Sequence, residues 1–228
     1  MINLQNNTFD LSASSRAVRH NVLRNTYWLL ALSMIPTVLG AFIGVLAQVP
    51  IMGGGMGALL FLAIAFGFIW AIERNKESGL GVALLLGFTF FMGLMLTPLL
   101  SHTLGYSNGG LLIMGAFGGT ASVFAVMATI ATVSKRDFSG LGKWLFAGLV
   151  VMIIASLANI FLGIPALALT ISVVLIAIFS AYILYDVQQI VNGGETNYIS
   201  ATLRIYLDVY NIFVRLLSLL GIFGGSRD

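Results

Sequence analysis

The sequence predicts an all-α integral membrane protein, a bundle of seven transmembrane helices with the last helix at its centre. Of the 228 residues, 59% are hydrophobic and only 8% are charged, and the mean hydropathy is +1.01. A soluble domain could not cover its surface with so few charges. The second observation is that seven apolar segments of roughly bilayer-crossing length follow one another, with short turns between them. The third is a polar stripe on the last segment.

The chain divides into an N-terminal tail and one transmembrane domain. Residues 1–25 are polar and are expected to form a cytosolic tail, and residues 26–228 form a single seven-helix domain. Pro36 and Pro98 fall within the first and third spans, where proline often bends a helix. The expected spans are residues 27–48, 55–72, 79–100, 111–133, 144–163, 166–191 and 199–223.

The distribution of Lys and Arg predicts the orientation in the membrane. The first, third and fifth loops carry no Lys or Arg, whereas the tail and the second and fourth loops carry Arg16, Arg19, Arg24, Arg74, Lys76, Lys135, Arg136 and Lys143. Positively charged loops stay in the cytosol, so the N-terminus and the even loops are expected there. A complete last span would place the C-terminus outside, and a re-entrant last helix would place it inside. Charge leaves both alternatives open.

The last helix carries most of the polar side chains found within the spans. At about 100° per residue, five of its residues fall within an arc of roughly 80°: Arg204, Asp208, Asn211, Arg215 and Ser218. A helix that crosses lipid cannot turn such a stripe toward acyl chains. The stripe must face protein or water, which predicts that this helix lies at the centre of the bundle.

Asp186 belongs to the preceding helix, which is expected to run from Pro165 to Asn192 and to end at Gly193. Asp186 lies about two turns before that end. Asp208 lies about three turns after the start of the next helix, if Thr196 or Asn197 is the N-cap. Helices joined by so short a turn are antiparallel neighbours, so the two carboxyl groups can reach a similar depth.

Two interpretations of this carboxylate pair remain open. In the first, Asp186 and Asp208 titrate together as a pH sensor, or bind a cation when both are charged. Arg74, at the end of the second span, is then a candidate counter-ion that closes the path. In the second, Asp208 pairs with Arg204 or Arg215, Asp186 is a solvated residue near a helix end, and Arg74 is an ordinary cytosolic anchor.

Several classes of function find no support in the sequence. There is no cysteine, which excludes disulfides, thiolate zinc sites and cysteine catalysis. Tyr185 and Asp186 match the first half-motif of intramembrane aspartyl proteases, but the residues before Asp208 lack both glycines of the second half-motif. No nucleophile elbow, phosphate loop or zinc motif is present. We therefore expect neither an enzyme nor a cofactor, and the charge of +3 gives no indication of nucleic-acid binding.

The C-terminal third carries a specific family resemblance. The segments concerned are Ala181 to Ile190, Gly193 to Ile199 and Tyr206 to Phe213, with Arg24 to Tyr27 at the entry to the first span. Together they resemble the Bax inhibitor family of membrane proteins, and most closely its bacterial YccA-like branch. The resemblance covers nearly the whole chain and implies location in the bacterial inner (plasma) membrane.

The resemblance implies a fold in which two layers of three helices wrap the last helix. It implies a pH-sensitive calcium leak channel whose sensor is an aspartate pair matching Asp186 and Asp208, with Arg74 as the best match to the family's arginine lock. YccA-like members are also linked to the modulation of a membrane-anchored AAA protease. A non-transporting regulator of such a protease is therefore the alternative to the channel, and the intact aspartate pair favours the channel.

Overall fold

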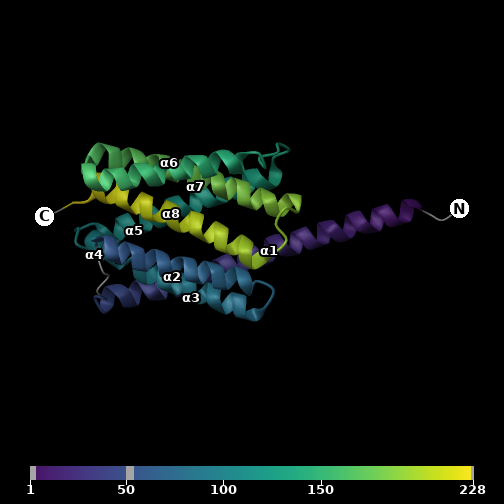
Figure 1. Ribbon diagram of the computed structural model, residues 1–228, viewed down its shortest axis with the longest axis horizontal. Coiled ribbons are helices and arrows are strands. Elements are labelled where there is room, and N and C mark those ends of the chain that lie inside the picture. The colour runs from purple at the N-terminus through teal and green to yellow at the C-terminus, as the bar shows by residue number, and fades with distance from the viewer. Residues whose placement is uncertain (1–3, 50–53, 227–228) are drawn as a thin grey trace.

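The computed structural model describes residues 4–49 and 54–226, and the side chains from residue 18 onward within those ranges. The tail residues 1–3 and the Arg16 side chain lie outside this part. The described chain forms helices and no β-strand, as the sequence predicts. The helices are α1 (Leu4–Leu46), α2 (Gly54–Arg74), α3 (Gly79–Met95), α4 (Thr97–Leu104), α5 (Gly109–Val133), α6 (Leu141–Leu162), α7 (Pro165–Asn192) and α8 (Tyr198–Gly224) (Figure 1).

Six of these helices are long and apolar enough to cross a membrane, and α3 and α4, bent by 41° at the break between them, would together form a seventh span. The bend falls at Leu96, and Pro98 lies in the first turn of α4. Proline has no N–H to give to a continuing helix, so the break follows from the sequence. Pro36 has a smaller effect, because α1 continues through it as one helix.

The segment expected as a tail is helical and continuous with the first span. The apolar part of α1 begins at Val18, and the part before it projects beyond the ends of the other helices (Figure 1). The tail therefore extends away from the bundle as a helix.

The last helix lies at the centre of the bundle. It packs against α1, α2, α3, α4, α5 and α7, and α6 alone does not reach it. On one side α3 packs between α1 and α2, and on the other α7 packs between α5 and α6. Figure 1 shows α8 running between these two groups. The expected arrangement, a central last helix between two three-helix layers, is confirmed.

Hydrogen bonds at both ends show that α8 crosses the whole bundle. At its start, Asn197 Nδ2 donates to the carbonyl oxygen of Lys76, in the α2–α3 loop, at 2.9 Å. At its end, Asn108 Nδ2, in the α4–α5 loop, donates to the carbonyl oxygen of Gly224 at 2.6 Å. These two loops lie at opposite ends of the bundle. Gly224 therefore lies at the opposite end of the bundle from Asn197, which favours a complete last span over a re-entrant one.

Candidate functional site: a cavity between three helices

The turn between α7 and α8 brings their polar side chains together. Gly193 ends α7 with a φ of +80°, a left-handed conformation that favours glycine. Asn197 then caps α8, its side-chain oxygen accepting hydrogen bonds from the N–H groups of Ile199 and Ser200. The two helices are thus antiparallel neighbours, as the sequence predicts.

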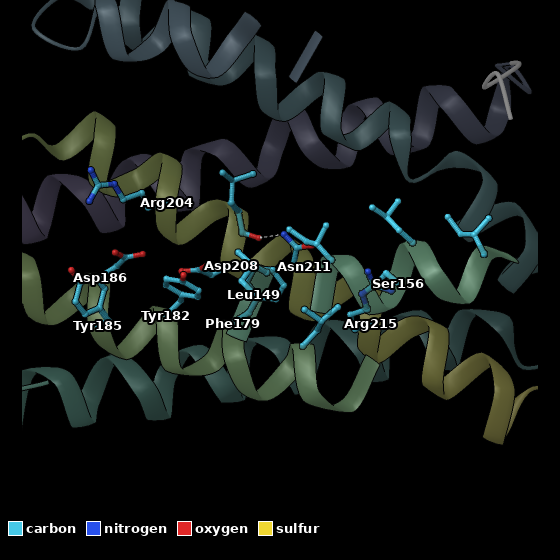
Figure 2. A pocket seen from close by; sticks show the side chains of 15 residues that line it. Leu149, Ser156, Phe179, Tyr182, Tyr185, Asp186, Arg204, Asp208, Asn211 and Arg215 are labelled. Carbon is cyan, nitrogen blue, oxygen red and sulfur yellow. Dashed lines mark hydrogen bonds between the residues drawn. The ribbon is translucent and has the colours of Figure 1, made fainter. Parts of the chain in front are cut away.

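A cavity of about 620 Å³ lies between α6, α7 and α8. The polar stripe of α8 forms one wall, and apolar side chains form most of the remainder. Asp186 and Asp208 both line it, and they are only 8% and 5% exposed. The lining residues are Leu149, Ile153, Ser156, Leu157, Ile160, Leu175, Phe179, Tyr182, Tyr185, Asp186, Arg204, Leu207, Asp208, Asn211 and Arg215 (Figure 2).

The two carboxyl groups face the same part of this cavity from different helices. Figure 2 shows Asp186 on α7 and Asp208 on α8, with Tyr182 beside them. They interact electrostatically with each other, and Tyr182 lies within electrostatic range of both. Asp208 Oδ2 is buried and has no hydrogen-bond partner in the described part of the chain, but the two carboxyl groups are close enough for one of them, when protonated, to donate to the other. A buried acceptor of this kind calls for a proton, a cation or water.

The pair by itself is an incomplete calcium site. The residues that the structure describes contain no group of three or more His, Cys, Asp or Glu able to hold a metal ion. Calcium takes about six to eight oxygen ligands, and two carboxylates supply four oxygens.

Neither stripe arginine forms an ion pair with Asp208. Arg204 pairs with Glu195 at 3.4 Å and is half exposed, and it acts on Asp186 only through its electrostatic field. Arg215 lies at the other end of the cavity, near Ser156 (Figure 2). Asn211, between them, donates to the Leu207 carbonyl oxygen at 2.8 Å. Along the cavity, the two carboxyl groups therefore lie at one end, and the Arg215 guanidinium lies at the other.

The structure does not bring Arg74 to the carboxyl pair. Arg74 lies at the end of α2, over the ring of Trp70 at 5.6 Å, and it is not among the residues that line the cavity. Its neighbour Glu73 makes the contact with α8, because Ser200 Oγ donates to Glu73 Oε2 at 3.0 Å. The role of Arg74 as a counter-ion stays a prediction.

Sequence reasoning missed Gln188, which lies two residues after Asp186 and is 3% exposed. Its Oε1 accepts from the Phe138 N–H at 2.5 Å, and its Nε2 donates to the Arg136 carbonyl oxygen at 2.7 Å. The amide therefore fixes the α5–α6 loop, and with it the start of α6, to α7. A polar residue within an apolar helix was the available signal.

A hydrogen bond within the same loop also stabilises its turn. The Ser139 N–H donates to Asp137 Oδ1 at 2.9 Å. This bond holds the pKa of the exposed Asp137 carboxyl below its ordinary value. Asp137 lies outside the cavity and offers a matched control for its two buried carboxyl groups.

Comparison with known proteins identifies the family. Residues 19–225 match the family described as "Inhibitor of apoptosis-promoting Bax1". The chain is 41% identical over 209 residues to "Modulator of FtsH protease YccA" from Escherichia coli strain K12, covering 92% of each chain. Its counterpart in E. coli O6:H1, equally similar, is named "Inner membrane protein YccA". An uncharacterised protein of Neisseria meningitidis serogroup A is 37% identical over 221 residues, 95% of this chain and 97% of that one.

These matches extend over nearly all of the described helices, including the α7–α8 hairpin and the cavity that it lines. They confirm the resemblance that the C-terminal segments indicate. The chain is a multi-pass helical membrane protein that belongs to the Bax inhibitor family.

Proposed function

We propose that this protein resides in the bacterial inner membrane and modulates a membrane-anchored protease, without being an enzyme itself. The observation that carries the proposal is the 41% identity to the FtsH modulator YccA, over 92% of both chains. The family match over residues 19–225 includes the membrane bundle and the part of α1 from residue 19 onward, surfaces that a membrane partner can contact.

The helical extension of α1 gives such a partner a surface outside the bundle. It continues the first span without a break and projects beyond the other helices (Figure 1). The positively charged residues of the tail and even loops favour a cytosolic position for this end. We propose that this extension contacts the protease, and that the bundle anchors it.

A deletion tests this proposal. Removing residues 1–17 leaves the apolar span Val18–Leu46 intact, so membrane insertion is expected to persist. In cells, the deletion should abolish the effect on turnover of a protease substrate and the co-purification of the protease. A variant in which an unrelated helical sequence replaces residues 1–17 is the control for length. Full modulation by the deletion variant, at equal membrane abundance, would refute this role.

The carboxyl pair supports a second candidate function, a pH-sensitive path for calcium or another cation. Two largely buried carboxyl groups line one cavity, and Asp208 Oδ2 has no hydrogen-bond partner among the described residues. Protonation would remove the negative charge that attracts a cation, so the pair would act as a gate. Arg74 would serve as the counter-ion in a state where α2 has approached α7, since these helices do not pack against each other here.

Reconstituted vesicles distinguish the two candidates. The vesicles contain a calcium dye. The channel hypothesis predicts that the calcium flux differs between pH 6 and pH 8, and that this difference is lost in Asp208→Asn. Asp137→Asn is the matched control, because Asp137 is an exposed carboxylate outside the cavity. Equal flux at both pH values, unchanged in Asp208→Asn, would exclude the gate and leave the protease modulator.

A further inference from the structure

We propose that the end of the cavity around Arg215 binds an anionic phospholipid of the surrounding bilayer. Its phosphate would lie on the guanidinium, and one acyl chain would lie along the apolar residues that α6 contributes. This inference rests on neither proposed function, because it depends on a different charged group at the other end of the cavity.

The first step is the isolation of Arg215. Its Nε is buried, and among the described residues it has no hydrogen-bond partner. Arg215 also takes part in neither of the two ion pairs that these residues form, Lys76–Glu73 and Arg204–Glu195. At 1.5 Å per residue, Arg215 lies about 26 Å from the start of α8 and about 14 Å from its end, within the depth of the hydrocarbon core if α8 spans the bilayer. An unpaired guanidinium there is costly unless an acceptor or an anion reaches it.

The second step is the shape of the cavity around this group. Apart from Ser156, its α6 wall is apolar, and Ile153, Leu157 and Ile160 line the cavity while remaining 49%, 54% and 74% exposed. Because α6 packs against α7 and not against α8, the cavity opens between α6 and α8 toward the lipid. A bilayer molecule can therefore enter sideways, and its acyl chain finds an apolar wall beside Arg215.

The third step concerns the charge of the lipid headgroup and the size of the cavity. Asp208 is the nearest acid of the stripe, about 10 Å away along the helix, so the ammonium group of a zwitterionic lipid would find no acid beside Arg215. A lipid with a net negative headgroup has no ammonium group that needs an acidic partner. Its phosphate can accept two parallel N–H hydrogen bonds from the arginine. The volume of about 620 Å³ lies within the roughly 300–1,000 Å³ of small-molecule pockets, enough for part of one lipid.

Native mass spectrometry of the full-length protein tests this. The protein is released from nanodiscs of phosphatidylcholine containing a small fraction of phosphatidylglycerol, and the lipid retained on each molecule is counted. We expect selective retention of phosphatidylglycerol, weakened roughly tenfold in Arg215→Gln, as expected for loss of a charged hydrogen bond. Arg204→Gln is the matched control, because Arg204 is half exposed and already paired with Glu195.

A second variant guards against misfolding of the first. Leu157→Trp enlarges an exposed side chain at the opening without changing any charge, and we expect it to reduce retention as well. Three results would overturn the proposal: equal retention of phosphatidylcholine and phosphatidylglycerol, unchanged retention in a folded Arg215→Gln protein, or displacement of the phospholipid by an equimolar free fatty acid.

Discussion

Gln188→Ala tests how strongly the α5–α6 loop is held to α7. The substitution removes two hydrogen bonds, one from the Phe138 N–H and one to the Arg136 carbonyl oxygen. Since this loop is partly exposed, water can replace both partners, and each bond contributes about 1 kcal/mol. The total of about 2 kcal/mol raises the population of the detached loop about 30-fold.

Limited trypsin digestion in detergent measures that population, because cleavage of a rapidly opening segment follows its equilibrium fraction. We expect faster cleavage after Lys135 and Arg136 in Gln188→Ala, with cleavage after Lys76 unchanged as the internal reference. Gln189→Ala is the matched control, since the neighbouring amide makes no hydrogen bond to this loop. Equal cleavage of the loop in wild type and Gln188→Ala would refute the argument that this amide positions α6.

Three further substitutions test the packing of α8 and its neighbours by thermal unfolding in detergent. Gly93→Ala should destabilise the protein by about 1–3 kcal/mol, because a Cβ there would overlap the backbone carbonyl of Thr37, whereas Gly87→Ala, with ordinary spacing, should not. Tyr206→Phe should lose about 1 kcal/mol, because the hydroxyl is 2.9 Å from Thr37 Oγ1 and 3.4 Å from the Thr89 carbonyl oxygen. The loss should be smaller in the Thr37→Val background, and fully additive losses would contradict the pairing with Thr37. Asn197→Ala should lose about 1–2 kcal/mol as a helix cap, and an unchanged unfolding temperature would contradict it.

Much of the architecture follows from local sequence. Apart from the first span, whose helix begins far earlier than expected, and the third, which is broken, each span is a single helix close to its expected bounds, because apolar length and turn residues act within a few residues of one another. The Pro98 break and the Gly193 and Asn197 caps are equally local. The stripe from Arg204 to Arg215 was also predictable, since one helix period places these residues on one face, and the cavity lies along that face.

Only the tertiary structure shows which side chains the site brings together. Sequence alone left open whether Asp208 pairs with an arginine, whether Arg74 lies beside the carboxyl pair, and at which end of the bundle the chain finishes. The packing shows Asp208 without an arginine partner, Arg74 over Trp70, and the end of α8 beside the α4–α5 loop. Each of these depends on where distant helices meet, which no local pattern specifies.

The sequence by itself therefore determined the class of protein, the helices, the family and the polar face of α8. The tertiary structure decided which groups meet across that face: two carboxyl groups at one end of a cavity, an isolated guanidinium at the other, and Gln188 holding the adjoining loop. The physical reason is that hydropathy and helix period act along the chain. Ion pairing and burial are set instead by contacts between segments far apart in it.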